Sequence, residues 1–134
     1  MLIVQPRGVS FGAVVWSGVS SVSIGRRAAK SFVEFGDEGP HAVLADVPEQ
    51  RVDVTVVQEL AGDDAGALVP GESGVLSFEA GPNSSGAGRT RVTLTGVVMS
   101  VRYAVSQRSG SVRTVELVAI SSDGVVDPVV VESV

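Results

Sequence analysis

Few side chains in this sequence have the types and spacing that catalysis requires. His41 is the only histidine, and it follows Gly39 and Pro40, which favour a turn. No Gly-x-Ser-x-Gly motif supplies a serine nucleophile, and the absence of cysteine excludes thiol nucleophiles, disulfides and thiolate metal sites. We therefore expect no enzyme activity and interpret His41 as a surface or cap histidine.

Two loops resemble binding sites only superficially. Asp63, Asp64 and Glu72 could offer oxygen ligands to a hard cation such as calcium, but their spacing matches no calcium-binding loop, so a solvated acidic loop is the simpler interpretation. The glycine-rich residues 81–88 lack the lysine and the strand-to-helix context of a phosphate-binding loop. We expect no metal and no cofactor.

Charge is sorted along the chain. Eleven acids and one base, Arg51, lie between Glu34 and Glu79, in a chain of net charge −5. The later segment contains no acid and five arginines: Arg89, Arg91, Arg102, Arg108 and Arg113. Opposite charges on different faces favour head-to-tail association of copies, unless the two segments are merely solvated and mix in the fold. The acidic balance and few aromatics argue against tight nucleic-acid binding, so we expect the arginines to pair with acids.

Composition predicts one all-β domain. A chain of 134 residues suits a single domain, and abundant Val and Gly favour β-strands joined by glycine turns. We expect a mainly antiparallel β-sandwich or barrel with at most one short helix. No apolar run reaches the roughly 18 residues of a membrane span, and the first residues lack the features of a signal peptide, so we expect synthesis in the cytoplasm and no membrane association.

Alternation of apolar and polar residues is clearest around residue 52. Val52, Val54 and Val56 share one face of a predicted strand. The other face carries Arg51, Asp53, Thr55 and Glu59. Such a strand belongs to a sheet with one wet side.

A long hairpin is predicted from residue 91 to residue 120. Val92 and Leu94 share one phase, and after Gly96 the apolar phase shifts to Val97, Met99, Val101, Tyr103 and Val105. A bulge at Gly96 would absorb this shift. Arg108, Ser109 and Gly110 form the predicted turn, and residues 112–120 return. A last strand is expected over residues 125–131.

The first half of the chain is less regular. Strands are expected over residues 9–16, 19–24 and 31–35, although residues 26–30 could begin a short helix. Residues 41–47 are expected to end as a strand before Pro48, which lacks an amide donor. Residues 61–74 and 81–88 are predicted to be exposed loops.

Several of these stretches resemble tail tube proteins of long-tailed bacteriophages and related gene transfer agents. The first stretch is residues 36–52, GDEGPHAVLADVPEQRV. The others are Val101-Arg102-Tyr103, Ser106-Gln107, Val112-Arg113-Thr114-Val115 and Ser121-Ser122-Asp123-Gly124. They are strand and turn residues without a catalytic signature. The resemblance implies a compact β-sandwich or barrel with a short helix, hexameric rings, and a stacked hollow tube for DNA in the virion tail.

The resemblance gives the charged residues candidate roles. The wet face at Arg51, Asp53, Thr55 and Glu59 is the candidate lumen lining, where acids would repel phosphate and DNA would pass unbound; an ordinary outer surface is the alternative. Candidate contacts between subunits or rings are Asp63, Asp64, Glu72, Arg89, Arg91, Arg102, Arg108 and Arg113. Implied partners are further copies of the chain, the tape measure, terminator and distal tail proteins and, in a contractile tail, a sheath.

Two other functions remain open. A tail terminator or distal ring protein would share the fold without polymerising indefinitely. A monomeric ligand-binding β-domain, such as a sugar-binding module, would need aromatics for stacking, and this chain offers only Trp16 and Tyr103 beyond its phenylalanines.

Overall fold

The computed structural model of the chain describes residues 2–4, 6–60, 68–81, 89–107 and 110–133. Within these residues the chain forms strands and turns and no helix, which confirms the predicted all-β class. The short helix expected from the resemblance is not found there. The strands are β1 (Leu2–Val4), β2 (Arg7–Phe11), β3 (Val14–Val15), β4 (Val19–Phe35), β5 (Ala42–Leu60), β6 (Ser73–Ala80), β7 (Thr90–Ser106), β8 (Gly110–Ile120) and β9 (Val129–Ser133).

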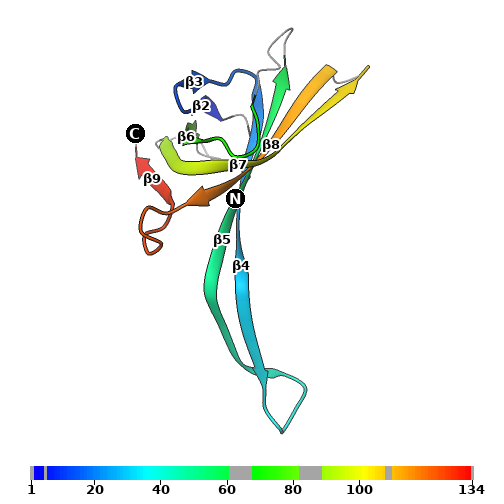
Figure 1. The fold of residues 1–134 in the computed structure, drawn as a ribbon, viewed down its shortest axis with the longest axis vertical. Coiled ribbons are helices and arrows are strands. Elements are labelled where there is room, and N and C mark those ends of the chain that lie inside the picture. Colours follow the sequence, from blue (N-terminus) through cyan, green and yellow to red (C-terminus); the bar gives the residue numbers. More distant parts are fainter. Residues whose placement is uncertain (1, 5, 61–67, 82–88, 108–109, 134) are drawn as a thin grey trace.

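All described strand pairs are antiparallel and belong to one sheet (Figure 1). The strand order is β1-β4-β5-β8-β7-β6-β2-β3, and β9 also pairs with β7. One edge of β7 pairs with β6. The other edge pairs with β9 along Thr90–Leu94 and with β8 along Thr95–Ser106. Antiparallel neighbours need only turns between them, as the glycine-rich composition indicated.

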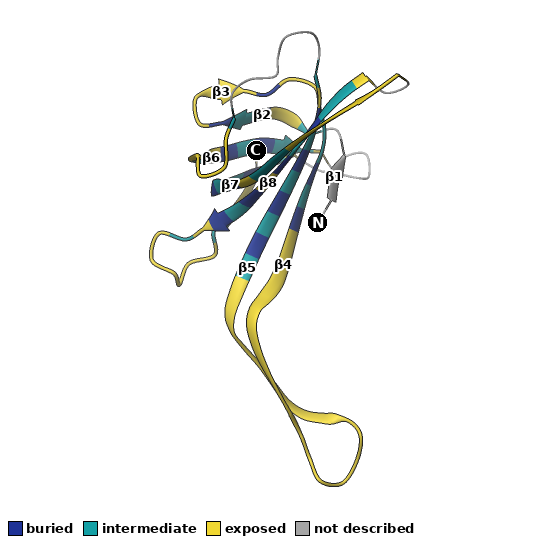
Figure 2. Ribbon diagram, turned by 45° about the vertical axis from the view of Figure 1, so that its right-hand side comes forward, coloured by how far each residue is buried: buried dark blue, intermediate teal, exposed yellow. Residues whose placement is uncertain are grey.

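The sheet curves around a single apolar core. Buried side chains alternate along β5 at Val52, Val54 and Val56, and along β8 at Val115 and Leu117. The other large, fully buried side chains of the core are Val9, Val22, Leu76, Phe78, Val92, Leu94 and Val98. They come from β2, β4, β6 and β7, so both halves of the sheet face the same interior (Figure 2).

β4 and β5 continue far beyond this core. They pair with each other from Val19 and Gln58 to Phe35 and Ala42, whereas β8 pairs only with Val52–Leu60 of β5. Residues 27–51 therefore project as a two-stranded ribbon, here called the arm (Figures 1 and 2). Nine residues of β4 at roughly 3.3 Å each make the arm about 30 Å long.

The arm corrects several sequence predictions. Residues 26–30 are part of β4 and do not begin a helix, and residues 19–24 and 31–35 belong to the same strand. β5 runs through Pro48 because the register shifts between Lys30↔Glu49 and Phe32↔Asp46, which leaves Pro48 in a bulge. A bulge on a ribbon with open edges tolerates a residue without an amide donor.

The phase of β7 is also corrected. Val92, Leu94, Gly96 and Val98 remain in one inward phase, and the bulge falls between Val98 and Ser100. The register shift brings Val101 back toward the core, whereas Met99, Tyr103 and Val105 are exposed. A Cβ at position 96 would lie 3.3 Å from Leu117 Cδ2 and Leu94 Cδ1, so Gly96 is needed for close packing and not for a bulge.

The remaining predicted strands need smaller corrections. Residues 9–16 form two short strands, β2 and β3, separated by a turn at Gly12 and Ala13. The last strand starts at Val129, because Val125 and Val126 lie in an exposed bend. The predicted β7–β8 hairpin is confirmed, although Arg108 and Ser109 of its turn lie outside the described residues.

The bend before β9 is organised by two aspartates. Asp123 Oδ1 accepts hydrogen bonds from the backbone amides of Val125 and Val126, and these bonds lower its pKa. Asp127 accepts from the Val129 amide and pairs with Arg26 at 3.0 Å, and both interactions lower the pKa of Asp127. The Arg26 pair ties this bend to the base of the arm.

Candidate functional site

The arm exposes apolar side chains along most of its length. Phe35 is 64% exposed and Val43 72% exposed, although both are large and apolar. The other exposed apolar residues of the arm are Phe32, Val33, Leu44 and Val47. Residues directly opposite in an antiparallel pair lie on the same side of the ribbon, so Val33 and Ala45 occupy one face and Phe32 the other. The arm therefore exposes apolar groups on both of its faces.

The outer part of the arm is also acidic. Residues 31–50 contain no Lys or Arg, and their acids are Glu34, Asp37, Glu38, Asp46 and Glu49. The basic residues of the arm lie nearer the body; they are Arg27, Lys30 and Arg51. The turn of residues 36–41, here called the arm tip together with Phe35, contains Asp37 and Glu38. The arm tip therefore combines an exposed aromatic ring with two carboxylates.

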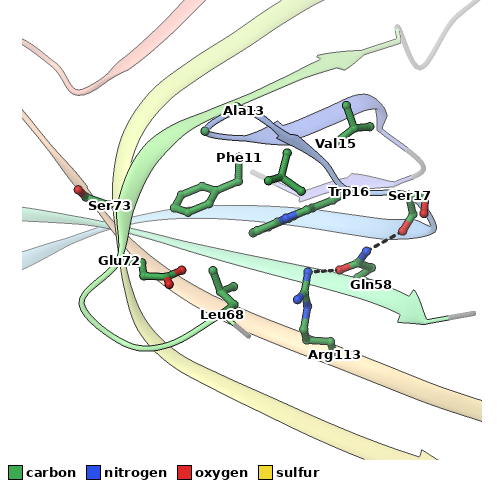
Figure 3. Close-up of a pocket in the computed structure, with 12 residues that line it drawn as sticks. Phe11, Ala13, Val15, Trp16, Ser17, Gln58, Leu68, Glu72, Ser73 and Arg113 are labelled. Carbon is green, nitrogen blue, oxygen red and sulfur yellow. Dashed lines mark hydrogen bonds between the residues drawn. The ribbon is translucent and has the colours of Figure 1, made fainter. Parts of the chain in front are cut away.

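A pocket lies at the opposite end of the molecule from the arm tip. Its volume is about 580 Å³, and β2, β3 and the ends of β5 and β8 contribute to its walls (Figure 3). The lining residues are Phe11, Gly12, Ala13, Val14, Val15, Trp16, Ser17, Gln58, Leu68, Glu72, Ser73 and Arg113. The rings of Phe11 and Trp16 are 5.2 Å apart between centroids and form an aromatic wall.

One buried cation lines this pocket. Arg113 is 4% exposed, and its Nη2 donates a hydrogen bond to Oε1 of Gln58, whose Nε2 donates to the Ser17 carbonyl oxygen at 2.7 Å. The guanidinium lies 5.0 Å from the centroid of the Trp16 ring, a cation–π contact. Among the described residues, Nε of Arg113 has no hydrogen-bond partner and the guanidinium has no carboxylate partner. Within the described residues, the pocket thus presents a buried positive charge that hydrogen-bonds only to a neutral side chain, with the Glu72 carboxylate elsewhere in its lining.

The predicted wet face of β5 is confirmed as a face that points away from the core. Arg51, Asp53 and Thr55 are half-buried, and Glu59 is exposed. The strand register extends this face across β4, β5, β8 and the part of β7 that pairs with β8. By the same register the face also carries Ser21, Ser23 and Thr114 together with the half-buried Val57, Val112 and Val118, so small polar and aliphatic side chains are mixed on it.

Positive and negative charges balance on this face. Asp53 accepts from Nε of Arg27 at 2.8 Å and from Nε of Arg51 at 2.7 Å. By register, the described charged residues of the face are Arg27, Arg51 and Arg102 against Asp53, Glu59 and Glu116. The face therefore has no net charge, in contrast to the acidic lining expected from Asp53 and Glu59 alone.

The predicted contact residues lie in different places. Arg91 pairs with Glu79 at 3.1 Å across β6 and β7, so at this point the acidic and basic segments mix in the fold. Glu72 lines the pocket with Arg113, whereas Arg89 and Arg102 are exposed elsewhere. Asp63, Asp64 and Arg108 lie outside the described residues, as do most of the predicted loops of residues 61–74 and 81–88.

The described residues place His41 in the exposed turn of the arm. Among them, no three acidic or histidine side chains come close enough to hold a metal ion. A search of the same residues for a helix that could cross a membrane also finds none.

Sequence reasoning missed the pocket, although a signal was present. Gln58 continues the inward phase of Val54 and Val56, and Arg113 continues that of Val115 and Leu117. A polar residue at a core-facing position of a strand must find a buried partner. The two residues are direct neighbours across β5 and β8, which only the strand register could reveal.

Comparison of the chain with models of protein families and with curated proteins gives no match.

Proposed function

We propose that this chain is a structural subunit of a virion tail that closes into rings, six-membered in keeping with its resemblance to tail tube proteins, and stacks into a tube for DNA. The exposed arm is the observation that carries this proposal. It supports self-assembly because a two-stranded ribbon without a core is marginally stable alone and gains stability by packing on another surface.

The composition of the arm favours a protein neighbour. Burying one large apolar side chain contributes about 1.5–3 kcal/mol, so covering Phe32, Phe35, Val43 and Leu44 would offset much of the cost of ordering the ribbon. Because both faces carry apolar groups, the arm fits between two surfaces, as a ring or stack of subunits would supply.

The contact is of the kind that builds rings and filaments. An arm projecting from one end of a subunit meets a different surface on the next subunit, which makes the interface heterologous. Heterologous contacts close into a ring when the rotation between copies closes, and they otherwise continue indefinitely.

The polar face of β4, β5, β8 and β7 is the proposed lumen lining. Phosphate contacts with Lys and Arg supply most non-specific DNA affinity. On this face the three described arginines are balanced in number by three acids, and Arg27 and Arg51 both pair with Asp53. DNA would slide along such a surface because it offers no excess positive charge.

An arm-shortened variant tests the proposal. Residues 29–49 are replaced by Asn-Gly, which joins the paired residues Ala28 and Gln50 by a two-residue hairpin turn. Electron microscopy should show tubes of the full chain and isolated subunits of the variant. Circular dichroism controls for the fold. Tubes formed equally by both proteins would contradict the proposed role of the arm.

The same images distinguish a tube protein from a terminator or distal ring protein, which would form single rings without further growth.

The pocket favours a second candidate, a monomeric ligand-binding β-domain, because its volume and aromatic wall suit a small molecule. A chain that stays monomeric at high concentration would support that candidate.

A further inference from the structure

The arm tip and the pocket at Arg113 have complementary chemistry. We propose that the pocket of one copy receives the arm tip of a second copy, so that Phe35 packs against the aromatic wall and a carboxylate of Asp37 or Glu38 pairs with Arg113. This inference rests on the proposed self-assembly and names the surface that the arm contacts.

The pocket needs an anion more than a neutral ligand. Among the described residues the Arg113 guanidinium contacts an amide and an aromatic ring and forms no ion pair, although Glu72 also lines the pocket. The guanidinium therefore retains much of its desolvation cost, which a paired carboxylate offsets through charge-assisted hydrogen bonds. Nε of Arg113 has no partner among the described residues but is itself buried, so a carboxylate in the pocket would pair with the terminal nitrogens of the guanidinium. Figure 3 shows the guanidinium below the Trp16 ring, on the same side of the pocket as Gln58.

The arm tip offers the matching groups. Asp37 and Glu38 form no ion pair within the described residues, and Phe35 is mostly exposed. A pocket of about 580 Å³ falls in the range that holds several side chains, so a turn carrying one ring and one carboxylate is of suitable size.

The geometry requires two copies. The arm projects about 30 Å from the body, and Figures 1 and 2 show its tip at the far end from β3, whose residues Val14 and Val15 line the pocket. An arm tip therefore cannot fill the pocket of its own chain. A tip-to-pocket contact is heterologous and can repeat from copy to copy.

Cysteine trapping tests the contact, because the chain has no native cysteine. One preparation carries Asp37→Cys at the arm tip, and the other carries Ala13→Cys at the exposed rim of the pocket. Mild oxidation of the mixture should give a disulfide-linked heterodimer. The control pairs Asp46→Cys, an exposed acid on the side of the arm, with Ala13→Cys. Equal cross-linking of both mixtures, or none in assembled protein, would overturn the inference.

Trp16 gives a second readout because it is the only tryptophan and lines the pocket. Its fluorescence should change as the protein assembles. Asp37→Asn with Glu38→Gln should raise the concentration at the midpoint of that change on the order of tenfold, as expected when a buried charge loses its partner. Asp46→Asn with Glu49→Gln removes the same charge elsewhere on the arm and should leave the midpoint unchanged.

The outcomes distinguish the two proposals. Tubes that form without a change in Trp16 fluorescence, and without the tip-to-pocket disulfide, would overturn this inference and leave the proposed function standing. If the protein stays monomeric, a cyclic peptide of residues 33–43 tests the pocket alone, since it contains no tryptophan. A change in Trp16 fluorescence that charge reversal at Asp37 and Glu38 abolishes would support the contact. No change at millimolar peptide would overturn it together with the proposed function.

Discussion

Gln58 and Arg113 are direct neighbours across β5 and β8, and the buried amide of Gln58 accepts a hydrogen bond from the buried guanidinium of Arg113. Gln58 also donates to the Ser17 carbonyl oxygen, so one side chain links the pocket wall to the turn before β4. The pair fixes the orientation of the only buried charge found among the described residues.

Replacing Gln58 by Leu should destabilise the fold by about 3 kcal/mol or more, because it leaves a buried charge with one fewer partner. The double variant with Gln58→Leu and Arg113→Met should recover most of that loss, since an apolar pair of similar volume needs no partner. Chemical denaturation monitored by circular dichroism measures both. A double variant no more stable than Gln58→Leu would show that the pair itself supports the fold.

Val98 and Met99 test the corrected phase of β7. Val98→Asp should cost about 4 kcal/mol or prevent folding, because the side chain is 1% exposed and the new charge would be buried. Met99→Asp should change the free energy of unfolding by only about 0.5 kcal/mol, since Met99 is 50% exposed. Equal losses in the two variants would contradict the inward phase.

The bend of residues 121–128 should respond to acid. The pKa values of Asp123 and Asp127 are lowered from 3.8 by hydrogen bonds that favour the ionised carboxylates. The ionised carboxylates of Asp123 and Asp127 therefore stabilise the bend fully above pH 3.8. This stabilisation is lost as the pH falls through their lowered pKa values, which lie below 3.8. NMR titration should show both carboxyl groups titrating below 3.8, together with shifts of the Val125, Val126 and Val129 amides. Titration at or above 3.8 would contradict the hydrogen bonds.

Glu59 and Glu116 test the balanced charge of the proposed lumen face. Replacing both by lysine should preserve the fold, because both are exposed and neither forms an ion pair among the described residues. The excess of positive charge should make assembled tubes retain DNA in a salt-dependent manner that the parent lacks. DNA binding to the outside of tubes, seen by microscopy, would place the face on the outer wall.

The sequence predicted those parts of the fold in which local alternation agrees with burial. Val52, Val54 and Val56 alternate against polar neighbours, and the structure buries all three. Gly96 misled the prediction of phase because glycine occurs both at bulges and where another side chain packs closely, and only the position of Leu117 decides between them.

The arm could not be predicted because its strands have no core to impose a pattern. Its acids appeared in the sequence as an acidic segment, but local periodicity says nothing of how far a hairpin extends past the last strand that pairs with it. That limit is set by the end of β8 at Ile120, which reaches β5 only as far as Val52. The pocket likewise depends on residues that are distant in sequence, Trp16, Gln58 and Arg113.

The most direct test of the central claim is a cryo-electron microscopy reconstruction of the purified chain, with its arm intact, after assembly. We expect stacked rings around a continuous channel, with the face of Asp53, Thr55 and Glu59 toward the channel and the arm of each subunit packed on a neighbour. A protein that remains monomeric, or rings with that face on the outer wall, would contradict the proposal.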